Sequence, residues 1–169
     1  MDDRRISIEE LRQQQRDNWP EVYAVANPAL LRLVRLSDLI HREAAKTLQD
    51  ANLLSAEFDV LAALRRQTAP HIVSPTELCR ALLISSGGLT KVLYRLQERG
   101  LISRPPNPND GRSLLVALTD AGKSLVELAM EGIMALHKQQ VGGLSEKELT
   151  ALDQVLEKML QQAEQRDLD

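Results

Sequence analysis

Apolar residues recur with helical spacing along most of the chain, and one interval departs from that spacing. Between Ser74 and Leu118 the pattern predicts a helix, a turn, a second helix, a short strand, a polar loop and a returning strand. Long stretches with helical spacing lie on both sides of this interval. The pattern therefore predicts a mainly α-helical protein with one small β-hairpin.

The first helix of the interval has a clear start signal. Ser74 is suited to the N-cap, Pro75 to the first helical position, and Glu77 completes a capping box, so the helix should run to about residue 83. Residues 84–87 then supply a turn and a new N-cap. Two helices joined by so short a turn are typical of a helix-turn-helix.

The second helix separates two kinds of side chain. Its buried face is expected to hold Leu89, Val92, Leu93 and Leu96. The opposite face holds Gly87, Thr90, Lys91, Tyr94 and Glu98, with Arg95 at its margin, and Gly100 should end the helix. Small residues at the start would let the backbone approach another surface closely. This arrangement suits the major groove of DNA, where small polar groups and a tyrosine reach base edges and cations meet phosphate.

The end of the interval predicts a hairpin. Residues 105–112 combine prolines, asparagines and an Asp-Gly pair, which indicates a loop, and Leu114–Leu118 indicates a buried strand. Arg112, oriented by Asp110, could enter a minor groove from the hairpin tip. The full order of elements is that of a winged helix-turn-helix. The predicted DNA-binding residues are Ser85, Ser86, Gly87, Thr90, Lys91, Tyr94, Arg95, Arg104, Asp110 and Arg112.

Composition and charge support a DNA-binding role for this interval. The chain has 169 residues and a formal net charge of −3, yet residues 75–112 carry six Lys or Arg against three Asp or Glu. The single cysteine, Cys79, fits a reducing compartment and is expected to pack in the core. No apolar leader or long apolar run occurs, so a soluble, cytoplasmic protein is expected. No catalytic motif, cofactor site or metal-ligand cluster is present in the sequence, which disfavours an enzyme.

The flanking segments predict a dimer. Residues 1–26 form an arm with a short helix capped by Ser7 and Glu10, residues 27–54 and 119–169 form dimerisation helices, and residues 55–118 form the DNA-binding lobe. Ser55 and Thr119 are the expected N-caps of the helices that follow them. The helix after Thr119 is apolar on more than one face, so it should be buried on several sides. A homodimer would bury this excess and hold two recognition helices roughly 34 Å apart on a palindromic operator.

These residues resemble a known family. The hairpin carries Asp110-Gly111-Arg112 and a strand that ends in Leu118-Thr119, which resembles the wing of the MarR family of bacterial transcription regulators. The resemblance covers roughly residues 17–165. It implies a sequence-specific, ligand-responsive DNA-binding regulator, most often a repressor.

A second resemblance concerns a ligand. The stretch from Glu57 to Arg66, with Trp19 upstream, is similar to the PecS, urate-responsive branch of the family. That resemblance implies that Trp19, Asp59 and Arg66 bind a urate-like effector, although the branch has an arginine where this chain has Val92. The residues themselves favour a planar anionic or phenolic ligand. Two alternatives stay open, a structural ion pair on the helix and a Trp19 that anchors the arm.

A different function class also fits the pattern. A winged helix can act as a protein-interaction or assembly module without specific DNA binding, and the negative net charge permits this. That alternative leaves the cluster of Lys91, Arg95, Arg104 and Arg112 without a purpose. The DNA-binding regulator is therefore the leading hypothesis.

Overall fold

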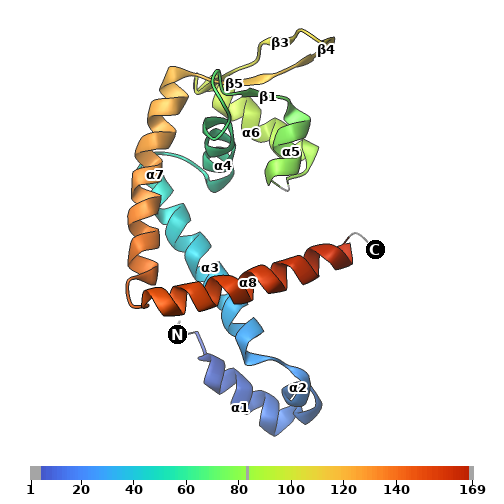
Figure 1. Ribbon diagram of the computed structural model, residues 1–169, viewed down its shortest axis with the longest axis vertical. Helices are drawn as coiled ribbons and strands as arrows, with labels where there is room; N and C mark the ends of the chain where they lie inside the picture. The colour runs from blue at the N-terminus through green and yellow to red at the C-terminus, as the bar shows by residue number, and fades with distance from the viewer. Residues whose placement is uncertain (1–4, 83, 168–169) are drawn as a thin grey trace. The chain divides into compact units, whose positions relative to one another are not determined.

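The computed structural model describes residues 5–82 and 84–167, with the side chains of residues 111, 112 and 167 outside that description. The chain is mainly α-helical and carries short antiparallel strands, as predicted (Figure 1). Its own contacts divide it into two compact units, Met1–Lys46 and Thr47–Asp169. The elements in chain order are α1 (Ile8–Asn18), α2 (Pro20–Val25), α3 (Pro28–Gln49), α4 (Ser55–Arg65), β1 (Ile72–Val73), α5 (Pro75–Leu82), α6 (Ser86–Glu98), β2 (Ile102–Ser103), β3 (Pro106–Asn107), β4 (Asp110–Leu114), β5 (Val116–Leu118), α7 (Asp120–Val141) and α8 (Glu146–Asp167).

The N-terminal arm contains the predicted helix and one more. The Ser7 hydroxyl accepts a hydrogen bond from the Glu10 amide at 3.0 Å, and the Glu10 carboxylate accepts from the Ser7 amide at 2.6 Å, so the predicted capping box is confirmed. Trp19 ends α1, and Pro20 starts the unpredicted helix α2 at its first position. Because Trp19 is 62% exposed, the expectation that it anchors the arm is wrong within a single chain.

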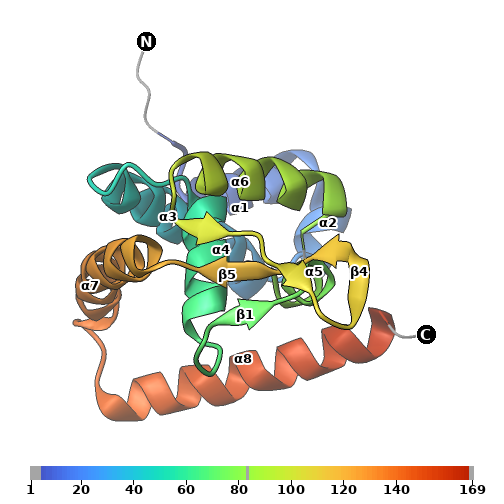
Figure 2. The ribbon, with the colours of Figure 1, turned by 90° about the horizontal axis from the view of Figure 1, so that it is seen from above.

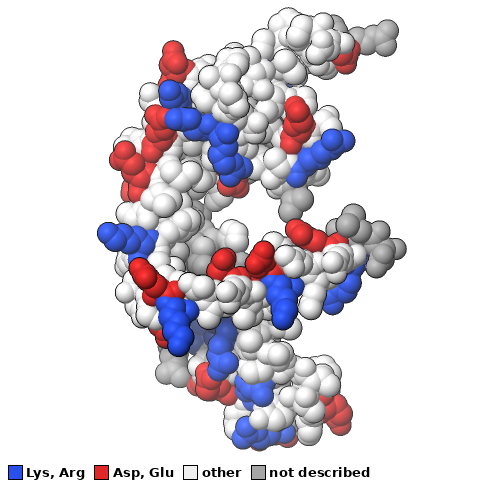
Figure 3. All heavy atoms as spheres, viewed as in Figure 1, with Lys and Arg blue, Asp and Glu red and all other residues white. Residues whose placement is uncertain are grey.

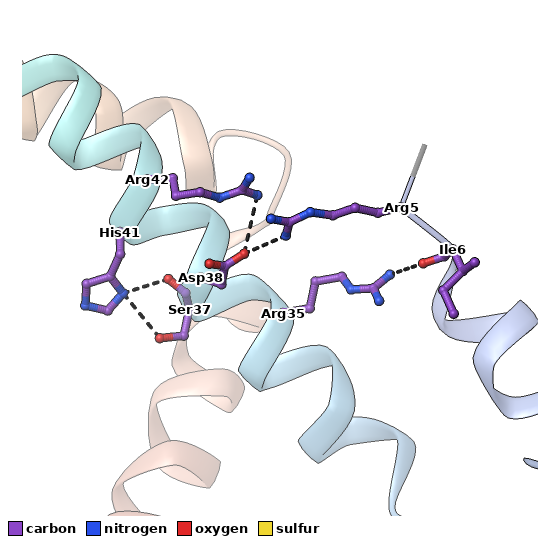
Figure 4. A network of polar contacts seen from close by, with 7 residues as sticks. All are labelled: Arg5, Ile6, Arg35, Ser37, Asp38, His41 and Arg42. Atoms are coloured by element: carbon purple, nitrogen blue, oxygen red, sulfur yellow. Dashed lines mark hydrogen bonds and ion pairs between the residues drawn. The ribbon is translucent and has the colours of Figure 1, made fainter. Parts of the chain in front are cut away.

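Ion pairs and hydrogen bonds join the segment before α1 to α3 inside the first unit. Arg5 donates to the Asp38 carboxylate at 2.6 Å, Arg42 lies 3.4 Å from the same carboxylate, and Arg35 donates to the Ile6 carbonyl at 2.6 Å (Figure 4). The hydrogen bond from Arg5 lowers the pKa of Asp38. The side chains of Arg5, Asp38 and Arg42 are about half exposed, and exposed ion pairs contribute little stability individually.

The core of the second unit lies where α4 packs against α5, α6, α7 and β5. Val60, Leu61, Leu64, Leu96 and Val116 are 0% exposed there. Burying a leucine or valine of this kind contributes roughly 1.5–3 kcal/mol. The lobe is therefore held mainly by apolar side chains that helical spacing identified in the sequence.

The start of α4 differs from the prediction. Ser55 is the first helical residue, and the N-cap is Leu54. The Leu54 amide donates to the Glu57 carboxylate at 3.0 Å. The buried acid Glu57 thus accepts from the amide of the N-cap residue itself, and the hydrogen bond expected from a Ser55 hydroxyl cap is not formed.

Three strands form one small sheet in the order β1-β5-β2, all antiparallel (Figure 2). Ile72 lies opposite Ala117, and Ile102 lies opposite Leu118. Because β5 lies between the other two strands, the return of the hairpin is fixed to the lobe. The hairpin therefore extends from the same lobe that carries α6.

The hairpin contains more strand than predicted. Residues 105–112 were expected to form a loop, but Pro106 and Asn107 pair with β4, with Asn107 opposite Asp110. A short strand at the edge of a sheet tolerates a proline, which has no N–H to donate. Leu114 is 46% exposed, so the expectation of a buried strand over residues 114–118 is also wrong at that end.

The long helix α7 begins at the predicted cap, since the Thr119 hydroxyl accepts from the Gly122 amide at 3.0 Å. In the single chain it buries only one face, through Val126, Ala129 and Ile133, while Leu128 is 63% exposed. The expectation of burial on several sides is therefore wrong for one chain alone. The apolar side chains of α7 that led to this expectation include Leu128 and Met134, and both are exposed in the single chain.

The last helix, α8, starts with a capping box, in which the Ser145 amide donates to Glu148 at 2.8 Å. No described side chain of α8 is buried. Acidic and basic side chains are interspersed along its visible face (Figure 3). Its exposed apolar residues are Leu152, Val155, Leu156, Met159 and Leu160. No helix in the described part of the chain combines the length and apolar character that a membrane crossing requires.

Candidate nucleic-acid interface

The start of α6 is an open helix end made of small residues. Ser85 is the N-cap, and its hydroxyl accepts from the Gly88 amide at 3.2 Å, as the turn predicted. The Thr90 hydroxyl donates to the Ser86 carbonyl at 2.9 Å, which keeps its side chain close to the helix. At Gly87 a Cβ atom would have nothing within 4 Å. The backbone of this helix end, which we call the α6 tip (residues 85–90), is therefore accessible from outside.

The two faces of α6 are separated as the sequence predicted. Leu89, Val92, Leu93 and Leu96 are each 4% exposed or less. Thr90, Lys91 and Tyr94 are exposed, and Tyr94 has 66% of its surface open. Lys91 forms no ion pair within the described residues. The outer face of α6 thus combines small groups, a phenol and an amine in an accessible position.

The end of α6 is fixed by a glycine in the left-handed region. Gly100 has a φ of +67°, and its amide donates to Gln97 at 2.9 Å. The Leu101 amide donates to the Leu96 carbonyl at 3.0 Å, which completes a Schellman motif. Leu101, just beyond the helix, is 6% exposed, as is common for the apolar residue of this motif. The Ser85 cap thus fixes where α6 begins, and the Schellman motif at Gly100 fixes where it ends.

Arg95 has a partner that the sequence did not indicate. Its Nε donates to Glu57 at 2.9 Å, and Arg99 donates to the other oxygen of the same carboxylate at 3.1 Å. Glu57 is 3% exposed. Sequence reasoning missed Glu57 because its partners lie 38 and 42 positions away along the chain. The only local signal was its place three residues after Leu54, where a helix-capping acid is common.

Arg104, which was expected to contact DNA, forms hydrogen bonds within the hairpin, and its contact with DNA stays a prediction. Its Nε donates to the Leu115 carbonyl at 2.9 Å, and a terminal nitrogen donates to the Leu114 carbonyl at 3.3 Å. Burial lowers the pKa of this guanidinium. Asp110 is exposed at the start of β4, and the side chain of Arg112 lies outside the described residues. The roles of Asp110 and Arg112 stay predictions.

The predicted ligand residues lie in different places. Arg66 is exposed and lines a hollow of about 250 Å³ between α4 and α7, together with Ala62, Val126 and Met130. At the same hollow Arg65 donates to Glu127 at 2.7 Å. Asp59 is exposed on α4 but does not line this hollow, and Trp19 belongs to the other unit. A single chain therefore offers Arg66 over an apolar floor, and the ligand site of three residues stays a prediction.

Other reactive side chains give no site. Cys79 is a free thiol of intermediate burial on α5. Among the described residues, no three His, Cys, Asp or Glu side chains gather as a metal site would require. The accessible features of the second unit are thus the α6 tip, the outer face of α6 and the braced hairpin.

Comparison with known proteins agrees with this geometry. Residues 48–113 match the family model described as MarR family. The HTH-type transcriptional regulator PecS of Dickeya dadantii is 33% identical over 153 residues, which cover 90% of this chain and 92% of PecS. The chain belongs to the MarR family. The predicted resemblance to this family, and to PecS within it, is confirmed.

Solved MarR-family structures share the fold. A mutant of MarR from E. coli complexed with operator DNA aligns with a TM-score of 0.69 and 31% identity over 78% of this chain and 94% of that chain. BpsR of Bordetella bronchiseptica, whose DNA binding is regulated by 6-hydroxynicotinic acid, aligns with a TM-score of 0.68 and 31% identity over 81% of this chain and 94% of that one. The winged helix-turn-helix fold is therefore confirmed, and the chain is a DNA-binding transcription regulator of the MarR family.

Proposed function

We propose that this MarR-family chain represses transcription in the cytoplasm by binding a palindromic operator as a homodimer, and that a small planar ligand releases it. The observation that carries the proposal is the exposed outer face of α6 beside a capped, small-residue tip. Such a helix end lets backbone and short side chains reach base edges in a major groove. The relatives that match the chain are transcriptional regulators, which supports the same class of function.

Individual contacts follow from the positions on α6. Ser85, Ser86 and Thr90 offer hydroxyl groups at the tip, where the helix dipole also favours a phosphate. Lys91 faces outward one turn later and suits a phosphate, and Tyr94 suits a base edge or a sugar. The hairpin would carry Arg112 toward the adjacent minor groove, and Arg104 would hold the hairpin beside the DNA.

Dimer formation would cover apolar side chains that a single chain leaves open. On α7 these include Leu128 and Met134, at 63% and 56% exposed, and on α8 they include Val155 and Leu160, at 56% and 59%. An exposed apolar surface of this kind marks an interaction site. MarR of E. coli has been solved with operator DNA, and a two-fold pair of recognition helices would match a palindromic site.

The proposed ligand is a planar anion or phenol. Arg66 stands over the apolar floor of Ala62, Val126 and Met130, an arrangement that suits a flat molecule with one acidic group. The regulation of BpsR by 6-hydroxynicotinic acid supports this ligand class. The urate-responsive branch has an arginine where this chain has Val92, and Val92 is 4% exposed on the buried face of α6. We therefore do not propose urate itself as the ligand.

The DNA-binding proposal is tested by an electrophoretic shift with the DNA upstream of the protein's own gene. We expect a shift whose midpoint rises steeply with salt, because each neutralised phosphate contributes about −0.9 to the slope of log K against log salt. Lys91→Ala should weaken the shift, while Lys138→Ala on α7 serves as the control for loss of one exposed cation. Equal binding by both variants would contradict the assigned role of α6, and no shift at all would favour the interaction-module alternative.

The ligand proposal is tested separately. A thermal-shift screen of planar aromatic acids and phenols identifies binders, which are then added to the DNA-shift assay. Arg66→Ala should bind DNA as the wild type does and lose the ligand-induced release, because coupling of about 1–3 kcal/mol between ligand and DNA depends on the bound anion. Full release in this variant would refute the role of Arg66.

A further inference from the structure

Glu57 is a buried carboxylate that joins two helices. It lies in the first turn of α4 and is 3% exposed. One oxygen accepts from the Leu54 amide at 3.0 Å and from Arg99 at 3.1 Å, and the other accepts from the Nε of Arg95 at 2.9 Å. Glu57 therefore contacts the start of α4 and two side chains from the C-terminal half of α6. We call Glu57, Arg95 and Arg99 the α4–α6 triad.

The charges of the triad do not cancel. A buried carboxylate needs compensation by a cation and by hydrogen bonds, and one arginine could supply both. Here two arginines surround one acid, which leaves an excess of one positive charge. The side chains of Arg95 and Arg99 are 44% and 30% exposed, whereas that of Glu57 is 4% exposed. The negative group is thus inside the lobe, and the excess positive charge is at the surface.

The triad also fixes the orientation of Arg95. Its hydrogen bond to Glu57 uses Nε, so the two terminal nitrogens of the guanidinium can still serve as donors, and the side chain as a whole is 44% exposed. A free surface arginine loses conformational entropy when it contacts a ligand, and a side chain held in advance loses less. Arg95 lies one residue after Tyr94 and one turn after Lys91, on the helix that would contact DNA.

We propose that Glu57 is a positioning residue for DNA recognition, which holds Arg95 so that its terminal nitrogens bind a DNA phosphate beside the recognition helix. This inference rests on the proposed DNA-binding function of α6. Glu57 itself does not touch DNA. Its effect reaches DNA through the orientation of Arg95, while Arg99 neutralises the buried carboxylate and leaves the charge of Arg95 for the phosphate.

The test compares Glu57→Gln, Arg95→Ala and the double variant with the wild type in a salt series of operator binding. Glu57→Gln keeps the size and an acceptor oxygen but loses the charge that orients two guanidiniums. We expect it to weaken binding about tenfold, as the loss of one charge-assisted hydrogen bond would. We also expect both single variants to lower the steepness of log K against log salt by about 0.9 for each lost phosphate contact. The double variant should lose no more than Arg95→Ala alone.

Glu127→Gln is the matched control, because it removes an exposed carboxylate from the pair with Arg65 and lies on α7. It should leave both the affinity and the salt dependence unchanged. A merely structural role for Glu57 would lower the thermal midpoint and the affinity yet keep the wild-type salt dependence, and that result would overturn the inference. Additive losses in the double variant would overturn it too.

A second variant keeps the test decisive if Glu57→Gln does not fold. Arg95→Lys retains the charge but lacks the planar fork that can bind a carboxylate and a phosphate at once. We expect its salt dependence to match that of Arg95→Ala, and wild-type salt dependence in Arg95→Lys would overturn the positioning role. Failure of the wild type to bind any upstream DNA would be a different outcome, since it would overturn the proposed function and this role with it.

Discussion

Replacing Gly87 by alanine should separate the stability of the protein from its affinity for DNA. Gly87 is the second residue of α6 and lies at the α6 tip. A Cβ atom at this position would meet nothing within 4 Å, and the backbone does not need a positive φ there. The free protein therefore has room for the methyl group, and any harm must arise in a complex.

The expected stability change is small and favourable. Alanine is preferred to glycine by roughly 0.8–1.0 kcal/mol in a helix interior, and we take about half of that for a first-turn position. A gain of about 0.5 kcal/mol raises the thermal midpoint of a chain of this size by about 1–2 °C. Binding should change in the opposite direction, because a methyl group in a closely packed contact costs about 1–3 kcal/mol, or roughly 5- to 150-fold in affinity.

The assay pairs thermal unfolding with fluorescence anisotropy on a labelled operator. Gly143→Ala is the control, since a Cβ there also meets nothing within 4 Å and the residue lies between α7 and α8, away from the α6 tip. We expect that control to bind DNA as the wild type does. Wild-type affinity in Gly87→Ala would refute the close approach of the helix backbone to DNA.

Three further predictions concern the scaffold. Gly122→Ala should destabilise the lobe by about 2 kcal/mol or more, measured by urea unfolding, because its Cβ would lie 2.0 Å from the Leu101 carbonyl oxygen; an unchanged midpoint would contradict this packing. Hydrogen bonds from Ser74 lower the pKa of Glu77, so its stabilisation is present above the ordinary value of 4.5 and is lost as the pH falls through the lowered value; the urea midpoint should drop on acidification, and less so in Glu77→Gln. Val155→Glu should dissociate the proposed dimer in analytical ultracentrifugation, because it places a charge on the open apolar face of α8; a variant that sediments like the wild type would place the interface elsewhere.

Local sequence signals predicted the parts of the fold that depend on neighbouring residues. The predicted caps at Ser7, Ser74 and Thr119 are all present, because a hydroxyl at the N-cap and an amide three residues later are close in any helix that starts there. The two faces of α6 were predicted for the same reason, since helical spacing alone decides which residues share a side.

The features that were missed depend on distant partners. From the sequence, Glu57 was identified only as the first residue of the stretch from Glu57 to Arg66. Its carboxylate can be buried because Arg95 and Arg99, far along the chain, form ion pairs with it. The hydrogen bonds from Arg104 to the Leu114 and Leu115 carbonyls were not predicted either, because these carbonyls come within its reach only when the hairpin has formed. Sequence spacing gives no information on such contacts, so a basic residue near a predicted interface could be either structural or functional.

The same limit applies to Pro106 and to α7. Prolines and asparagines correctly indicated a turn near Pro108, but they also masked the short pairing of β3 with β4. The apolar residues of α7 were identified in the sequence, and Leu128 and Met134 are exposed in the single chain. That a second copy of the chain covers them stays a prediction. The spacing of apolar residues shows that a helix has an apolar face to bury, but it does not show which molecule buries that face.

Hydroxyl-radical footprinting of the upstream DNA tests the central claim most directly. Two α6 tips held by one dimer should protect two patches about 10–10.5 base pairs apart, arranged symmetrically about one centre, and Lys91→Ala should lose both patches together. A single unbroken protected region, or protection by the wild type that Lys91→Ala and Gly87→Ala leave intact, would contradict the account.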